Sequence, residues 1–423
     1  MATEWYIFDL DGTLLDGSDE LKMSVLFECI QSFWNQALID FWFENPGYQS
    51  EALYMRGNNT QERFEPFITI NPQVHGAIVR DFMGHFSRER KTVHQRLSAS
   101  AQFSLHTDAK KCLEGLPSNA PRGIFTDSSR MQVNVCLEKC SELSRYFWDS
   151  IITQDDVPNE RKPHPAGIQL LMRKMGIIPE QTTYVDDMFP GIQSAVSAAV
   201  NRIYWVDRNG ITVRSRSHEL NLLIQTGRVV RIRTLDILSQ PRASYVLVMR
   251  GRQGVGKSTL MPRIPFPIAT VSKDYVAERE WWNWNTCPDY NLVRDELYQK
   301  FTLSALENIG RYGSVCLDAP FTQQDDVILM IDKIRAQYPG IPVIVATVTA
   351  PLSQVVGRMW HRTPDRCVGF MRRPQGDSYD TSFHDTLRVS VLPHGVHVIS
   401  LSNRDNTSPE KVLRPLLDKV KSL

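Results

Sequence analysis

An apolar segment that runs into a glycine-rich loop constrains the fold of this chain more than any other feature. The apolar segment is residues 245–249, and the loop that follows it contains Gly251, Gly254, Gly256, Lys257, Ser258 and Thr259. Glycines allow backbone N–H groups to surround a phosphate, while the lysine reaches the β- and γ-phosphates and the serine hydroxyl binds Mg²⁺. The pattern predicts a strand, a phosphate-binding loop and a helix of an α/β fold that binds ATP with Mg²⁺.

A pair of aspartates follows the first apolar segment of the chain. Residues 5–8 read Trp-Tyr-Ile-Phe, and Asp9 and Asp11 come next, before Gly12 and Thr13. Open α/β sheets place their ligands at the carboxyl ends of strands. Two carboxylates there can divide the work of phosphoryl transfer, because one attacks phosphorus while the other protonates the leaving oxygen and then activates water. A turn with solvated acids is the alternative interpretation.

Three more apolar segments in the first half end in polar residues. Residues 122–125 lead to Thr126-Asp127-Ser128-Ser129, residues 151–152 precede Arg161-Lys162-Pro163, and residues 182–185 lead to Asp186-Asp187. A threonine hydroxyl and a lysine held by prolines suit a phosphoryl group, and paired carboxylates suit Mg²⁺. Taken singly, the Thr-Asp-Ser-Ser segment would also serve as a helix N-cap, and the lysine would be a solvated loop residue.

Between the first apolar segment, residues 5–8, and the second, residues 122–125, the chain has a helical pattern. Apolar residues recur at spacings of three and four after Asp19, and a second long helix is predicted around residues 74–97. We therefore expect a helical insertion over about residues 16–105. As a cap it would exclude water from the carboxylates and select substrates; a separate helical domain is the alternative. Farther along, residues 207–217 with Arg208 predict a solvated loop.

The order of these features is an acid pair, a threonine, a Lys-Pro and a second acid pair, each after a strand. This order resembles the haloacid dehalogenase superfamily of phosphatases over about residues 1–240. The resemblance implies a Rossmann-like core, an aspartyl-phosphate intermediate and Mg²⁺. It implies Asp9 as the nucleophile and Asp11 as the acid/base. The phosphoryl binders would be Thr126, Asp127 and Lys162, and the metal ligands would be Asp9, Asp11, Asp186 and Asp187.

The candidate catalytic residues of the second half follow two predicted strands or lie on one predicted basic helix. Lys273-Asp274 follows one apolar segment and Asp318 follows another. Asp274 would accept the proton of an attacking hydroxyl, while Asp318 would hold Mg²⁺ or a substrate hydroxyl; either could instead cap a helix. Arg358 and Arg362 share a helical face and would clamp phosphates, with a solvated basic helix as the alternative.

This half resembles the polynucleotide kinase branch of P-loop kinases. The resemblance implies that Asp274 activates a 5′-hydroxyl, that Arg362 contacts the transferring phosphoryl group with Arg358 beside it, and that Lys273 and Asp318 lie near the substrate. An arginine that phage enzymes of this branch carry three residues after the aspartate is here Ala277. The nearby Trp281, Trp282 and Trp284 would stack on bases or fill a core, and the sequence does not choose between these roles.

The whole chain thus predicts an α/β protein with two doubly wound sheets in tandem. Residues 1–240 would be a phosphatase with a helical cap over about residues 16–105, and residues 241–423 a P-loop kinase. Both activities together resemble polynucleotide kinase-phosphatases, which implies 3′-phosphatase and ATP-dependent 5′-kinase action on broken RNA or DNA ends, before a ligase. The alternatives are a metabolic fusion that acts on small hydroxyl compounds and phosphoesters, or a nucleotide-sensing module.

Composition narrows the cellular setting. The net charge of +1 gives no global basic field, so contact with nucleic acid must come from a local patch. No signal peptide and no membrane-spanning apolar run are visible, and we expect a soluble, cytoplasmic protein without a membrane partner. The seven cysteines are scattered and lack zinc-ligand spacing, which favours reduced thiols.

Overall fold

The computed structural model divides the chain into two compact units. It describes residues 4–44, 64–146, 148–208, 218–240, 244–251, 255–264, 268–281, 290–319, 324–351, 354–355, 393, 395–404 and 407–423. One unit comprises Met1–Leu220 and Ile232–Gln240, and the other comprises Asn221–Arg231 and Pro241–Leu423. The second unit thus includes a segment that the sequence analysis assigned to the first domain.

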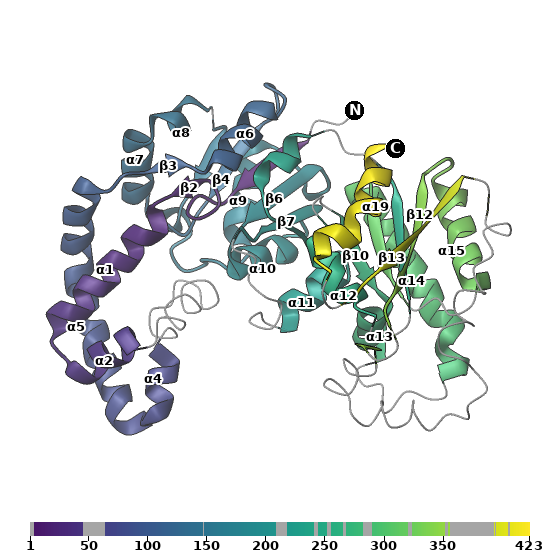
Figure 1. Cartoon of the computed structure of the whole chain (residues 1–423). Coiled ribbons are helices and arrows are strands. Elements are labelled where there is room, and N and C mark those ends of the chain that lie inside the picture. Colours follow the sequence, from purple (N-terminus) through teal and green to yellow (C-terminus); the bar gives the residue numbers. More distant parts are fainter. Residues whose placement is uncertain are drawn as a thin grey trace. The chain divides into compact units, whose positions relative to one another are not determined.

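A parallel sheet forms the core of the first unit (Figure 1). Its strand order is β5-β4-β1-β6-β7-β8, and the neighbours β5, β4, β1, β6 and β7 pair in parallel. The central strand is apolar and fully buried at Ile7 and Phe8, as expected where helices cover both faces of a sheet. The strands are β1 (Trp5–Phe8), β4 (Arg122–Phe125), β5 (Ser150–Ile152), β6 (Thr182–Asp186), β7 (Arg202–Val206) and β8 (Val230–Ile232).

Helices connect these strands, as a doubly wound sheet requires. Helix α7 begins at a capping box, in which the Ser129 side chain and Gln132 satisfy each other's backbone N–H groups. The helices are α6 (Thr107–Gly115), α7 (Arg130–Lys139), α8 (Ser141–Arg145), α9 (Ala166–Met175), α10 (Phe189–Ser197) and α11 (His218–Gln225). Short 3₁₀ turns lie at Gln154–Asp156, Pro179–Gln181 and Leu235–Ser239.

A helical insertion separates β1 from β4. It leaves and rejoins the core through two short antiparallel strands, β2 (Leu15–Asp16) and β3 (Ser104–Leu105). Figure 1 shows its two longest helices side by side. The insertion has an aromatic core of its own, in which the Phe64 ring lies 5.3 Å from Phe82 and 5.5 Å from Trp42. Its helices are α1 (Ser18–Phe33), α2 (Gln36–Glu44), α4 (Glu65–Ile70) and α5 (Pro72–Ser100).

The second unit is built on another parallel sheet, of order β10-β11-β9-β12-β13. Along β9, Val246 and Val248 belong to one apolar cluster while Leu247 and Met249 belong to another. Because alternate residues of a strand face opposite sides, helices bury both faces of this sheet. The strands are β9 (Val246–Arg250), β10 (Ala269–Ser272), β11 (Val315–Asp318), β12 (Val343–Thr349) and β13 (Val396–Ser402).

The helices of this unit are α12 (Lys257–Leu260), α13 (Lys273–Trp281), α14 (Tyr290–Tyr312), α15 (Gln324–Gln337) and α19 (Pro409–Lys421), with a 3₁₀ turn at Met261–Arg263.

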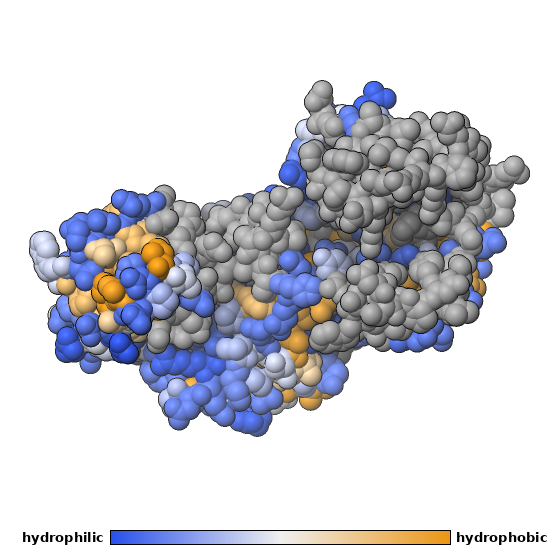
Figure 2. Space-filling view, turned by 90° about the horizontal axis from the view of Figure 1, so that it is seen from below, coloured by the Kyte–Doolittle hydropathy of each residue, from blue (hydrophilic) through white to orange (hydrophobic). Residues whose placement is uncertain are grey.

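The two parallel sheets confirm the predicted α/β fold class. Among the described residues, no helix combines the length and apolar character needed to cross a bilayer. Figure 2 shows hydrophobic and hydrophilic residues intermixed on the visible surface.

Candidate active site

The predicted phosphatase residues gather at one edge of the first sheet. Because β4, β1 and β6 are neighbours that run in the same direction, their carboxyl ends lie side by side. Asp9 follows β1, Thr126 follows β4 and Asp186 ends β6. The topology therefore brings together three residues that are far apart in the sequence.

A buried lysine ties two of the carboxylates together. The Lys162 Nζ lies 2.5 Å from Asp9 Oδ1 and 2.7 Å from Asp186 Oδ2, and the lysine side chain is only 5% exposed. Burial raises the pKa of Asp9, against the opposing effect of Lys162. Burial lowers the pKa of Lys162, but Asp186 and Asp9 together bring it above its usual range. The lysine is therefore held as a cation between two carboxyl groups.

Three carboxylates in this cluster suit a divalent cation. Oxygen atoms of Asp9, Asp186 and Asp187 all lie within 4.8 Å of one another. The Tyr184 hydroxyl donates to Asp186 Oδ2 at 2.6 Å, and Thr13 Oγ1 donates to Asp187 Oδ1 at 2.7 Å. Carboxylate oxygens held by such partners are the hard ligands that Mg²⁺ prefers. These residues therefore fit the predicted magnesium site.

Glycine is required next to this cluster. A Cβ atom at Gly191 would lie 1.8 Å from Asp186 Oδ2. Gly191 belongs to the first turn of α10, directly after the acidic pair. A side chain at this position would displace the carboxylate that meets Lys162.

Asp11 lies apart from the carboxylate cluster. Its Oδ2 accepts a hydrogen bond from Ser128 Oγ at 2.5 Å and lies 3.0 Å from Lys22 Nζ. Thr126 Oγ1 is 3.4 Å from the same oxygen. The acid/base role of Asp11 stays a prediction, and the described cluster of metal-ligating atoms does not include the Asp11 carboxylate. Lys22 and Ser128 were not singled out from the sequence.

The loop after β4 is organised by hydrogen bonds that involve its predicted phosphate-binding residues. Thr126 Oγ1 accepts from the Ser128 backbone N–H at 3.0 Å. Asp127 Oδ1 accepts from the Lys162 backbone N–H at 3.3 Å. The loop thus connects to the lysine loop, and its last residue, Ser129, caps α7. The helix-cap interpretation is therefore correct for Ser129, and the phosphate-binding roles of Thr126 and Asp127 stay predictions.

The prediction of a solvated loop over residues 207–217 is wrong at Arg208, and residues 209–217 lie outside the described residues. Its guanidinium donates to the carbonyl oxygens of Gly12 at 2.6 Å and Thr13 at 2.8 Å, and it forms an ion pair with Asp108 at 3.0 Å. Asp108 Oδ2 also accepts from the Leu235 backbone N–H at 2.9 Å. The arginine therefore fixes the turn after the acid pair, because polar groups of that turn need partners when they leave water.

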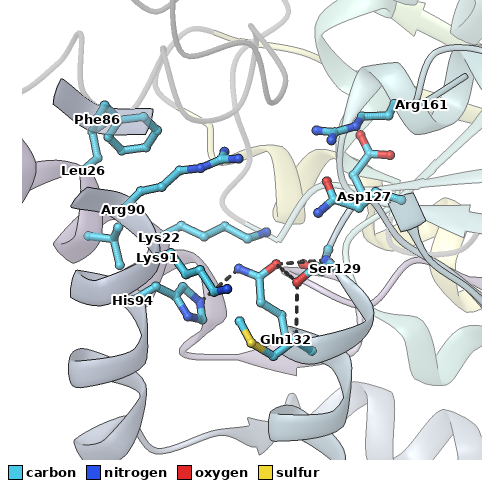
Figure 3. Close-up of a pocket in the computed structure, with 14 residues that line it drawn as sticks. Lys22, Leu26, Phe86, Arg90, Lys91, His94, Asp127, Ser129, Gln132 and Arg161 are labelled. Atoms are coloured by element: carbon cyan, nitrogen blue, oxygen red, sulfur yellow. Dashed lines mark hydrogen bonds between the residues drawn. The ribbon is translucent and has the colours of Figure 1, made fainter. Parts of the chain in front are cut away.

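A cavity of about 420 Å³ adjoins Asp127 and Ser128 (Figure 3). Its walls come from α1 and α5 of the insertion and from the core loops after β4 and β5. The lining includes Lys22, the acid/base aspartate's ion-pair partner, and His94 of α5. The His94 Nε2 lies 2.9 Å from the Gln132 amide nitrogen, and burial lowers the pKa of this histidine. The insertion therefore covers the carboxylate edge of the sheet.

The predicted phosphate-binding loop begins at the carboxyl end of β9, and its residues 252–254 lie outside the described residues. Gly256 is left-handed at φ 95°, and a Cβ atom at Gly251 would lie 2.5 Å from the Val348 carbonyl oxygen. Lys257 Nζ donates to the Gly251 carbonyl at 2.6 Å and lies 3.9 Å from Asp318 Oδ1. Burial lowers the pKa of Lys257 and raises that of Asp318. The Gly251 carbonyl and the side chains of Lys257 and Asp318 therefore lie close together at this end of the strand.

The structure describes some of the remaining predicted kinase residues and not others. Ser258 Oγ lies 3.4 Å from Asp318 Oδ2, and Thr259 begins the short helix after the loop. Asp274 is exposed in the first turn of α13. Lys273 is buried, with its Nζ 5.6 Å from the centre of the Tyr298 ring. The predictions for Gly254, Arg358, Arg362, Trp282 and Trp284, and for the Trp281 side chain, lie outside the described residues.

Comparison with known families identifies the domain that contains the first of these candidate sites. A family of haloacid dehalogenase-like hydrolases matches residues 6–205. Residues 6–205 form a haloacid dehalogenase-like hydrolase domain. The matched range spans the acid pair, the threonine loop, the lysine and the second acid pair, and it confirms the predicted haloacid dehalogenase-like domain, while the roles of these residues stay predictions.

Relatives of the haloacid dehalogenase-like domain include phosphatases. Pyrophosphatase PpaX of Oceanobacillus iheyensis is 29% identical over 204 residues, which cover 47% of this chain and 82% of that protein. Phosphoglycolate phosphatase of Photorhabdus laumondii is 28% identical over 196 residues, with 45% and 75% covered. The structure of CbbY from Rhodobacter sphaeroides in complex with phosphate is 19% identical, with a TM-score of 0.36 and 51% and 89% covered.

The first half of the chain is therefore a hydrolase of the phosphatase class. Haloacid dehalogenase phosphatases use Mg²⁺, and the cluster of Asp9, Asp186 and Asp187 supplies ligands for it. The metal would supply positive charge to the oxygens of the phosphoryl group.

Proposed function

We propose that the chain is a bifunctional enzyme for nucleic-acid ends, in which the haloacid dehalogenase-like domain removes a 3′-phosphate and the second unit phosphorylates a 5′-hydroxyl with ATP. The observation that supports the proposal is the buried Lys257, with Asp318 close by, at the carboxyl edge of a second parallel sheet, in the same chain as the haloacid dehalogenase-like domain. Ligands of open α/β sheets bind at this edge.

The phosphatase reaction follows from the contacts of two aspartates. Lys162 holds Asp9 Oδ1, which leaves Oδ2 to attack phosphorus. As the bond to the ester oxygen breaks, Asp11 donates a proton to that oxygen. Its carboxylate then takes a proton from water, which attacks the aspartyl-phosphate, and phosphate leaves with Asp9 restored. Lys22 and Ser128 orient Asp11 during both steps.

The kinase reaction relies on the loop cations and on Asp274. The buried Lys257 lies between the Gly251 carbonyl and Asp318, where ATP phosphates would compete for its ammonium. Asp318 and Ser258 would hold Mg²⁺ with oxygen ligands. Asp274 at the start of α13 would accept the proton of the acceptor hydroxyl. The predicted Arg358 and Arg362 would stabilise the transferring phosphoryl group.

The pairing of both activities favours a nucleic-acid end as the substrate. An enzyme that removed phosphate from an ester and replaced it on the same hydroxyl would only consume ATP. A broken strand instead presents a phosphate to be removed at one end and a hydroxyl to be phosphorylated at the other. Ends of RNA or DNA with a 3′-phosphate and a 5′-hydroxyl satisfy this requirement, and a ligase would act on the products.

A small-molecule substrate is the second candidate, and two observations favour it. The relatives are named for pyrophosphate and phosphoglycolate. The insertion also encloses a cavity of about 420 Å³, which is within the range of small-ligand sites. In this case the chain would be a metabolic phosphatase joined to a kinase of a small hydroxyl compound.

One assay separates the two candidates. The full chain is incubated with Mg²⁺, ATP labelled at the γ-phosphate, and an oligonucleotide that carries a 5′-hydroxyl and a 3′-phosphate. We expect label at the 5′ end and free phosphate from the 3′ end. Pyrophosphate, phosphoglycolate and hexose phosphates are assayed in parallel. Absence of label transfer, with a far higher kcat/KM on one of these small substrates, would support the second candidate instead.

A further inference from the structure

The cavity beside the phosphatase carboxylates has walls of two origins. Lys22, Arg90 and Lys91 come from helices α1 and α5 of the insertion, whereas Asp127 and Arg161 come from core loops. Figure 3 shows the Arg90 and Arg161 side chains extending toward each other from opposite walls. The space between them is therefore bounded by two guanidinium groups.

Cationic side chains outnumber carboxylates in this lining. Four cations, Lys22, Arg90, Lys91 and Arg161, accompany one carboxylate, that of Asp127. Lys22 is already paired with Asp11. Among the described residues, no ion pair involves Arg90, Lys91 or Arg161. Like charges that face one cavity repel each other unless an anion lies between them.

The transferring phosphoryl group does not account for this charge. That group meets Lys162 and the metal-binding carboxylates at the sheet edge. The three remaining cations line the side of the cavity formed by the insertion and the loop before Lys162. A ligand group that reaches them must belong to the part of the substrate that leaves.

Apolar side chains indicate the shape of that leaving part. Val25, Leu26 and Phe86 line the same wall, and the Arg90 guanidinium carbon lies 6.0 Å from the centre of the Phe86 ring. Such a surface suits a sugar or base ring next to an anionic group. We propose that this cavity binds a second phosphate, as a monoester or a phosphodiester, on the leaving group of the substrate, through Arg90, Lys91 and Arg161.

The inference rests on the proposed phosphatase reaction and specifies its substrate class. In a nucleic-acid end, the second group is the phosphodiester that precedes the terminal 3′-phosphate. In a small molecule, it is the second phosphate of a bisphosphate. Both have the same chemistry, because arginine binds the oxygens of either group with charge-assisted hydrogen bonds.

The test uses substrate pairs that differ by one phosphate. These are a nucleoside 3′-phosphate with the 3′,5′-bisphosphate, and a hexose monophosphate with the bisphosphate, beside a short oligonucleotide 3′-phosphate. For the full chain we expect kcat/KM to be at least about tenfold higher for the bisphosphate member of the pair that is hydrolysed. The preference should shrink as salt is raised, because ions screen exposed charges.

Variants assign the preference to named residues. In Arg90→Gln combined with Arg161→Gln the ratio within each pair should fall to about one, whereas Arg88→Gln, exposed on the same helix and outside the lining, should keep it. Circular dichroism checks that each variant is folded. A parent enzyme with equal kcat/KM on both members, or a folded double variant that keeps the preference, would overturn the inference.

The two levels of proposal fail in different ways. If nucleic acid is not the substrate, the oligonucleotide is not hydrolysed while the hexose pair still shows the charge preference, and the cavity inference stands. If the cavity does not bind a second phosphate, the oligonucleotide loses its terminal phosphate while neither pair shows a preference.

Discussion

The two phosphate sites that we propose for this chain depend on different parts of the polypeptide. At the carboxyl edge of the first sheet, side chains from separate segments neutralise one another, as Lys162 does for Asp9 and Asp186. After β9 the sequence predicts a loop of nine consecutive residues, in which the described Gly256 has the left-handed φ of 95° that favours glycine. A backbone site can be recognised from a short stretch of sequence, whereas a side-chain network depends on the fold that assembles it.

The largest effect should come from the nucleophile of the side-chain site. Asp9→Asn removes the attacking oxygen, and phosphatase kcat should fall by at least about 10³-fold. Phosphate release from an oligonucleotide or an aryl phosphate measures the loss. Kinase labelling in the same preparation serves as the control. Undiminished phosphate release would place the nucleophile elsewhere.

A substitution in the backbone site should affect the other reaction alone. Lys257→Ala removes the charge that reaches the nucleotide phosphates, and kinase turnover should fall by about 10²–10³-fold. Phosphatase activity should stay within a few-fold of the parent, because the residues of that site all lie before position 208. If a folded Lys257→Ala protein lost both activities, the two sites would be coupled.

A smaller effect should follow from the support of the metal ligands. Tyr184→Phe removes the hydroxyl that donates to Asp186 Oδ2 at 2.6 Å. Since partners of metal ligands orient them, we expect the Mg²⁺ concentration for half-maximal phosphatase activity to rise by about tenfold. A titration with Mg²⁺ measures this, with Tyr204→Phe, another buried tyrosine of the same sheet, as the control. An unchanged titration would mean that the ligands need no such support.

The smallest effect concerns the contact of His94 with Gln132. Burial lowers the pKa of His94 below the ordinary 6.5, with Asp11 and Lys22 as the charged groups that act on it. The unfolded chain therefore binds more protons below pH 6.5, so stability should decrease as pH falls through that window. His94→Gln should flatten this dependence by a degree or two in Tm between pH 5 and 8. Identical curves would show that the histidine contributes nothing.

Sequence reasoning succeeded where spacing alone carries the chemistry. The acid pairs and the threonine loop each follow an apolar run, and parallel strands bring such ends together. Lys22 was missed because a lysine on a helix of the insertion has the same pattern as a solvated one. Arg208 was misjudged because three arginines in a polar segment favour a loop, and only the fold places the Gly12 and Thr13 carbonyls beside one of them.

The segment Asn221–Arg231 had no local signal either. It groups with the second unit because of tertiary contacts, which no sequence motif predicts. The Asn308 side-chain amide donates to the Thr226 carbonyl at 3.3 Å, and the Tyr312 hydroxyl donates to the Arg228 carbonyl at 3.0 Å. Thr226 also forms a bridge with Val271 of β10. A domain boundary placed from composition at residue 241 therefore divides residues that belong together.

That segment determines how such a chain can be recombined. Joining two genes end to end produces a polypeptide that passes once from one unit to the next. This chain passes between its units at 220–221, at 231–232 and at 240–241. An exchange of everything after residue 240 for a homologous gene would leave Thr226 and Arg228 behind, facing substitutes for Asn308 and Tyr312. Chimaeras that carry residues 221–231 together with the C-terminal part should express as folded protein more often than chimaeras joined at 241.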